Sequence, residues 1–158
     1  MTILETLKKW SDIELGFTDK DIVLSKQNYR HIILYYFFGS CDLCAQTMDL
    51  DDANFKNLYR SILTYIGITD IEIDNVFEIW MLDKFSDKEL FIIKHGARCF
   101  REFGNNPEGV DGLRFCLTKF CVKVTNFFQF HFVGTNLLGG GEKKGPLFGR
   151  GPWAGPGL

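Results

Sequence analysis

The sequence predicts an all-α protein, a compact bundle of about six helices around a central hydrophobic helix. Capping boxes are the first indication: a Ser or Thr precedes a helix and a Glu follows three residues later, so that each side chain satisfies a free backbone N–H. Such boxes stand at Thr2, Thr69 and Ser86, and apolar residues at helical spacing follow each of them. The second indication is residues 32–38, seven consecutive apolar or aromatic residues, which fit a helix that neighbours cover on several sides.

The helices can be placed in order from their caps and apolar stripes. Gly67 is expected to take the left-handed conformation that ends the third helix, and Gly104 is expected to end the fifth. Asn106 and Pro107 supply an N-cap and a first-turn proline for the sixth helix. A further short turn is expected to open at residues 18–21. The expected helices span about residues 3–10, 26–48, 49–66, 70–84, 87–103 and 107–124.

The central helix, residues 26–48, carries both the least polar run of the chain and the pair Cys41 and Cys44. Gly39 and Ser40 lie in its middle, and a glycine at such a position either kinks a helix or admits a close neighbour. We expect the thiols of this helix to fill space in the core, because unpaired cysteines are among the most buried residue types.

The composition of the chain changes near residue 125. Residues 1–125 form the predicted helical bundle domain, whereas residues 127–133 alternate Phe with Gln and His, and the last 25 residues contain nine glycines and three prolines. A segment of that composition cannot bury a packed core. Residues 126–158 are interpreted either as a flexible tail that binds a partner, or as a non-native segment produced by a frameshift or read-through.

Charge and composition argue against several classes of function. The net charge of −2 gives no general attraction to nucleic acid, and no apolar run is long enough to span a bilayer. The first residues lack the cationic flank and apolar centre of a signal peptide. Without an export signal, the five cysteines are expected to be reduced thiols. We therefore expect a cytoplasmic protein that binds neither nucleic acid nor membrane.

A zinc site is one alternative for the cysteines. Cys41 and Cys44 share one helix face at spacing i, i+3, and His95 and Cys99 share another at i, i+4. Thiolates and imidazoles are the usual ligands of tetrahedral structural zinc sites. If the second and fifth helices pack together, these four residues could bind zinc, and the protein would then be a structural or regulatory zinc-binding protein.

Cys41-Asp-Leu-Cys44 directly follows the apolar run, and in this it resembles the strand–CxxC–helix entry of thioredoxin-like and glutaredoxin-like oxidoreductases. In those families the helix N-terminus lowers the pKa of the first thiol and makes it a nucleophile. The resemblance covers this segment alone, since no later strand pair follows and the predicted helix places both thiols in its interior. It implies a more remote alternative, thiol–disulfide exchange by Cys41 and Cys44.

The leading hypothesis is a non-catalytic module that works through protein–protein contacts. No nucleophile elbow, phosphate loop or dinucleotide fingerprint occurs in the sequence, and its acidic clusters lack the glycine and glutamate of an EF-hand. Basic residues of the fifth and sixth helices, such as Arg98 and Lys119, could contact an acidic partner. Four aromatic residues fall outside the inward stripes and are expected to form a partner surface, because aromatic residues are enriched at interfaces. They are Tyr29, Tyr36, Phe91 and Phe115.

Overall fold

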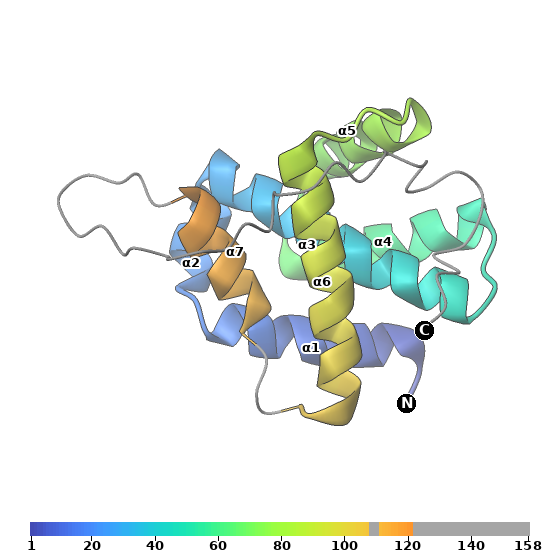
Figure 1. Cartoon of the computed structure of the whole chain (residues 1–158), viewed down its shortest axis with the longest axis horizontal. Coiled ribbons are helices and arrows are strands. Elements are labelled where there is room, and N and C mark those ends of the chain that lie inside the picture. The colour runs from blue at the N-terminus through green and yellow to red at the C-terminus, as the bar shows by residue number, and fades with distance from the viewer. Residues whose placement is uncertain (108–110, 122–158) are drawn as a thin grey trace, which may run out of the picture.

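The computed structural model describes residues 1–107 and 111–121, and within these residues it contains seven α-helices and no strand. The all-α prediction is therefore confirmed (Figure 1). The predicted tail, residues 126–158, lies outside the described residues. The helices are α1 (Ile3–Gly16), α2 (Lys20–Ser25), α3 (Gln27–Thr47), α4 (Asp52–Ile66), α5 (Asp70–Met81), α6 (Asp87–Asn105) and α7 (Gly112–Cys121).

The central helix is α3, as its apolar run predicted. Every residue from Ile32 to Cys41 is buried, because α3 packs against α2, α4, α5, α6 and α7. In Figure 1, α6 runs across α3, while α4 and α7 lie toward opposite ends of α3. None of the helices in the described residues is long and apolar enough to cross a membrane.

The crossing of α3 and α6 is the most extensive helix contact of the described chain. A Cβ atom placed on Gly39 would lie 1.9 Å from the carbonyl oxygen of Ile93, and one placed on Gly96 would lie 2.0 Å from that of Tyr36. Each glycine therefore rests directly on the backbone of the other helix. Gly39 was expected either to kink its helix or to admit a close neighbour, and the structure shows the close neighbour.

Several helix boundaries differ from the expected ones. α1 continues to Gly16 instead of ending near residue 10, and the added turns bring Glu14 into the core. The expected short turn is a complete helix, α2, whose N-cap Asp19 accepts a hydrogen bond from the backbone N–H of Ile22. α7 begins at Gly112 and not at residue 107, and α6 extends past its expected end to residue 105.

The capping boxes confirm three predicted helix starts. The Thr2 N–H donates to Glu5 Oε2 at 2.6 Å, and the Glu5 N–H donates back to Thr2 Oγ1 at 3.2 Å. Ser86 and Glu89 make the same reciprocal pair at 2.7 and 3.2 Å. A third box opens α5 at Thr69. These caps fix the first residue of α1, α5 and α6. The starting residue in turn determines which later side chains point toward the core and which toward solvent.

Three helices end at a residue in the left-handed conformation. Gly67 follows α4 with φ of 107°, as predicted, whereas α3 and α5 are followed by Asp49 and Asp83 with φ of 53° and 52°. The bonds of a Schellman ending close both aspartate turns: the Leu50 N–H donates to the Ala45 carbonyl at 2.8 Å, and a matching bond of 3.0 Å follows Asp83. Each aspartate thus places a negative charge beside the negative end of a helix dipole.

Replacing these two aspartates with asparagine is expected to stabilise the protein. Asp49→Asn and Asp83→Asn should each raise the free energy of unfolding by about 0.3–1 kcal/mol, because asparagine also adopts the left-handed region and carries no charge. Urea denaturation at low ionic strength measures the change. Asp52→Asn in the first turn of α4 is the matched control and should lower stability, since an acid there is favourable. A gain at all three positions would contradict the dipole argument.

Candidate functional site

Phe91 and Phe115 lie together on the outside of α6 and α7, around the ring of His95. His95 stacks on Phe91 with ring centroids 5.9 Å apart, and its centroid is 5.0 Å from that of Phe115. The Lys119 Nζ atom lies 5.2, 5.9 and 5.8 Å from the ring centroids of Phe91, Phe115 and Phe120. These five residues are called the aromatic–lysine surface. It is a cation seated among three phenyl rings, an arrangement in which the ring quadrupoles attract the ammonium group.

The other two predicted partner-surface residues have different positions. Tyr36 is 0% exposed, so its assignment to a partner surface is wrong. Tyr36 falls outside the inward stripes of the sequence, but α3 is buried on nearly every side. Tyr29 is half-buried in the first turns of α3, with Lys26 Nζ 5.2 Å from its ring centroid.

His95 is an uncharged member of the aromatic–lysine surface. Arg98 lies 2.7 Å from His95 Nδ1 and can only donate, so the ring proton is assigned to Nε2. Burial and, to a smaller extent, the Arg98 charge lower the pKa of His95 to about 4. The Nε2 atom is buried and makes no hydrogen bond to the rest of the described chain. At neutral pH the imidazole therefore acts as an aromatic spacer between Phe91 and Phe115.

A buried carboxyl group lies on the inner side of α7. Glu14 of α1 is 0% exposed. Its Oε1 accepts a hydrogen bond from the Tyr36 hydroxyl at 2.9 Å, and its Oε2 accepts one from the Leu113 backbone N–H at 3.0 Å. Because Leu113 is in the first turn of α7, the carboxyl group of α1 caps the start of a helix that is 99 residues later in the sequence.

Burial dominates the electrostatics of this carboxyl group. Removal from water raises the pKa of Glu14, the hydrogen bonds from Leu113 and Tyr36 offset part of that rise, and the resulting pKa is about 7. The pKa of the Tyr36 hydroxyl is raised well above its ordinary value, chiefly by burial and then by the neighbouring Glu14. Glu14 therefore exchanges its proton near neutral pH, while Tyr36 remains a hydrogen-bond donor.

The four residues proposed as zinc ligands do not form one cluster. Within residues 1–107 and 111–121, no group of three or more His, Cys, Asp or Glu side chains is placed to hold a metal ion. Cys41 is fully buried and lies close enough to Tyr59 of α4 to contribute to its raised pKa. Cys44 instead lines a cavity beside α1. Cys99 instead lies beneath α7, where a Cβ on Gly112 would approach its Sγ to 2.4 Å. The α3 and α6 helices do pack together, but Cys44 lies beside α1 and Cys99 lies against α7.

The Cys-x-x-Cys pair does not have the surroundings of a reactive thiolate. Cys41 and Cys44 are in the C-terminal half of a continuous α3, away from the positive end of its dipole. Burial raises the pKa of Cys44 to about 12 and raises that of Cys41 well above its ordinary value. Both thiols are therefore protonated at neutral pH, which disfavours the thiol–disulfide exchange that the resemblance implied.

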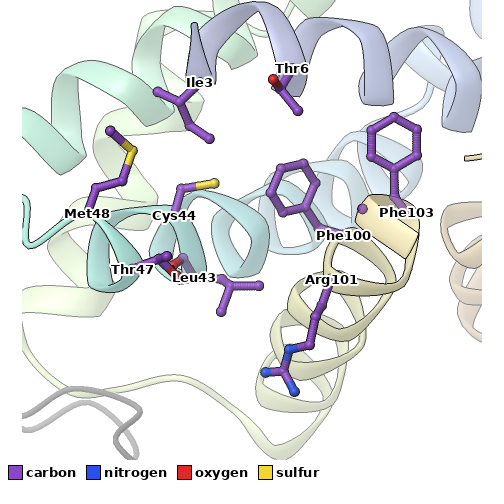
Figure 2. Close-up of a pocket in the computed structure, with 10 residues that line it drawn as sticks. Ile3, Thr6, Leu43, Cys44, Thr47, Met48, Phe100, Arg101 and Phe103 are labelled. Carbon is purple, nitrogen blue, oxygen red and sulfur yellow. The ribbon is translucent and has the colours of Figure 1, made fainter. Parts of the chain in front are cut away.

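A cavity of about 320 Å³ opens between α1, the end of α3 and the end of α6 (Figure 2). Its wall is almost wholly apolar, and the Arg101 guanidinium points away from the α1 side chains of Ile3 and Thr6. No set of converging polar groups stands ready to orient a ligand there, as small-molecule sites require. The residues that line it are Ile3, Thr6, Leu43, Cys44, Thr47, Met48, Phe100, Arg101, Phe103 and Gly104.

Sequence reasoning missed Glu14, although a signal was present. Glu14 continues the stripe of Leu7 and Trp10 at helical spacing, so an acid falls on the apolar face of α1. An acid in an apolar stripe is a candidate for a buried, perturbed group. The expected end of the first helix near residue 10 concealed this position.

Comparison of the chain with protein-family models, with curated proteins and with solved structures gave no match.

Proposed function

We propose that the protein is a non-catalytic helical module that binds another protein through the aromatic–lysine surface of α6 and α7. The observation that carries this proposal is the grouping of Phe91, Phe115 and Phe120 around one ammonium group at the surface. Phe115 is 37% exposed, so part of its ring is open to a partner. Aromatic side chains that are held rigid by neighbours are typical anchors of protein interfaces.

The charges of this surface favour an acidic partner. Lys119 and Lys88 make no ion pair with a carboxylate in the described part of the chain, and the Lys88 Nζ atom lies 5.3 Å from the Phe120 ring centroid. A partner segment that carries Asp or Glu beside apolar side chains would supply the missing anions and cover the rings. Opposite charge across an interface increases the association rate and excludes partners of the wrong sign.

Two further observations support a binding role in the cytoplasm. Four of the five thiols are buried, and those of Cys41 and Cys44 are protonated at neutral pH, so they offer no nucleophile. All five cysteines are free, which fits a reducing compartment. The protein's expected activity is therefore recognition rather than chemistry.

Site-specific photo-crosslinking in the native cell tests the proposal. A photoreactive phenylalanine analogue at position 115 is expected to give a discrete adduct with a protein whose crosslinked peptide is rich in Asp and Glu. Lys119→Glu should reduce that adduct by about tenfold or more, because it reverses the charge that lies among the rings of Phe91, Phe115 and Phe120. Lys119→Arg should retain it, since the cation is kept.

The matched control places the same analogue at Ile71, which is 75% exposed on α5. Equal adducts from positions 71 and 115, or an adduct at 115 that Lys119→Glu leaves unchanged, would contradict the proposed surface. Thermal denaturation of each variant verifies that the fold is kept. Because both positions are at the surface, stability changes are expected to stay within about 1 kcal/mol.

A further inference from the structure

We propose that Glu14 is a pH-sensitive latch: its protonated carboxyl group holds α7 against α1 and α3, and its ionisation favours release of α7. The latch goes beyond the proposed function. Its consequence for partner binding rests on that function, because α7 contributes Phe115, Lys119 and Phe120 to the aromatic–lysine surface.

The geometry of the latch consists of one carboxyl group joined to three helices. Glu14 belongs to α1, its Oε1 faces the Tyr36 hydroxyl of α3, and its Oε2 faces the Leu113 N–H of α7. The side chain is fully buried, and the inner face of α7 seals it from solvent through Leu113 and Cys116, both 0% exposed. Moving α7 away breaks one of these bonds and admits water to the carboxyl group.

The groups that face Glu14 compensate a negative charge only in part, because the Leu113 N–H and the Tyr36 hydroxyl donate to the carboxyl group but burial outweighs them. On α1, the indole N–H of Trp10 lies close enough to lower the pKa of Glu14, but it makes no hydrogen bond in the described part of the chain. From α3 comes Tyr36, and from α6 and α7 come the neutral thiols of Cys99 and Cys116. Asp111, immediately before α7, repels the charge. No cation is among the groups that act on Glu14 in the described residues.

The raised pKa of Glu14, about 7 against an ordinary 4.5, gives the direction of the effect. With α7 in place the group holds its proton more tightly than when it is hydrated. The stabilisation of the closed state is therefore complete below about pH 4.5 and is lost as the pH rises through about 7. From the two pKa values, ionisation favours the open form by about 10-fold at pH 5.5 and about 300-fold at pH 8.

α7 is the element expected to open. It has 10 residues, and it covers the bundle beside α1, α3 and α6 (Figure 1). Local openings of this kind draw on short elements with limited buried contact. Because Cys99 of α6 lies beneath α7 and Cys116 is on the inner face of α7 itself, an opening exposes two thiols that are otherwise inaccessible. Cys41 lies on the far side, against α4, and reports only global unfolding.

His95 titrates in the opposite sense and must be separated from the latch. Its pKa is lowered by burial, so His95 costs stability as the pH falls through about 6.5 toward 4. The two groups partly cancel in the pH profile of the native protein. The experiment therefore compares a rate in the native protein with the same rate in Glu14→Gln. Both proteins keep His95, so the effect of His95 cancels in the ratio of the two rates.

The experiment measures thiol modification by dithiodipyridine between pH 5.5 and pH 8 in the full chain and in Glu14→Gln. Mass spectrometry of peptides assigns the modification rate to Cys99, Cys116 and Cys41. The Cys99 and Cys116 rates of the native protein, divided by those of Glu14→Gln, are expected to rise by up to about 30-fold over this range. The same ratio cancels the pH dependence of the reagent. The Cys41 rate should stay far lower in both proteins.

Two results would overturn the latch. A rate ratio that does not change with pH would mean that Glu14 ionisation is not coupled to α7. Equal rates at Cys41 and Cys99 would mean that α7 opens only when the whole chain unfolds. Should Glu14→Gln fail to fold, NMR titration of the Glu14 side-chain carboxyl carbon in the native protein decides, and a midpoint below pH 5 refutes the latch. No partner enters these measurements, so they are independent of the crosslinking test.

Discussion

Gly39→Ala and Gly96→Ala are each expected to lower the free energy of unfolding by about 3–5 kcal/mol, more than substitution of any exposed residue. The added methyl group would meet a backbone carbonyl oxygen of the other helix at 1.9 or 2.0 Å. A carbonyl within a helix cannot rotate aside as a flexible side chain can, so α3 and α6 must separate. Since α3 contacts five other helices, that separation disturbs packing throughout the bundle.

Gly104→Ala is the matched control for this prediction. Gly104 is in the same helix as Gly96, but a Cβ there meets nothing within 4 Å. Alanine at this position should raise stability by about 0.5–1 kcal/mol, because it is the better helix former. Urea denaturation followed by tryptophan fluorescence measures all three variants. If Gly96→Ala stabilised the protein as Gly104→Ala does, the close crossing of α3 and α6 would be wrong.

The double variant adds a second, independent check. Gly39 and Gly96 face the same interhelical gap, so the first methyl group already forces the helices apart. The cost of the two substitutions together should fall short of the sum of the single costs by about 1 kcal/mol or more. Strict additivity would show that the two glycines respond to separate neighbours.

The helices of this chain were largely predictable because their determinants are local. Thr2 and Ser86 bond to groups three residues away, and the left-handed Gly67 closes a turn within five residues. Likewise, a run of apolar residues identifies a central helix without knowledge of its neighbours. Errors appeared where a boundary depended on distant packing: α1 continues past Trp10 because its last turns are covered by α7.

The candidate site was less predictable because it is made by contacts between distant residues. Phe91 and Phe115, two of the residues predicted for a partner surface, come from separate helices that meet only in the fold. Tyr36 was misplaced because a helix that is buried all round gives no periodic signal for its outer face. The hydrogen bond from Leu113 to Glu14 has no counterpart in local spacing, and the zinc hypothesis failed to identify a cluster for the same reason.

The second large effect is expected at Phe38, which joins α3 to α4, α5 and the segment before α6. Its side chain is 0% exposed. Its ring centroid lies 5.1 Å from Phe55, 5.4 Å from Tyr59, 5.9 Å from Trp80 and 5.4 Å from Phe85. All four pairs meet edge to face, the geometry in which the positive ring edge approaches a negative face.

Phe38→Ala should therefore lower the free energy of unfolding by about 3–5 kcal/mol, because it removes a buried ring and leaves a cavity that four rigid neighbours cannot fill. Phe17→Ala is the matched control: the same substitution at a side chain that is 40% exposed should cost less than about 1 kcal/mol. Urea denaturation measures both. Phe38→Leu, which keeps most of the apolar volume, should recover more than half of the loss. A loss at Phe38 no larger than that at Phe17 would contradict the central position of Phe38.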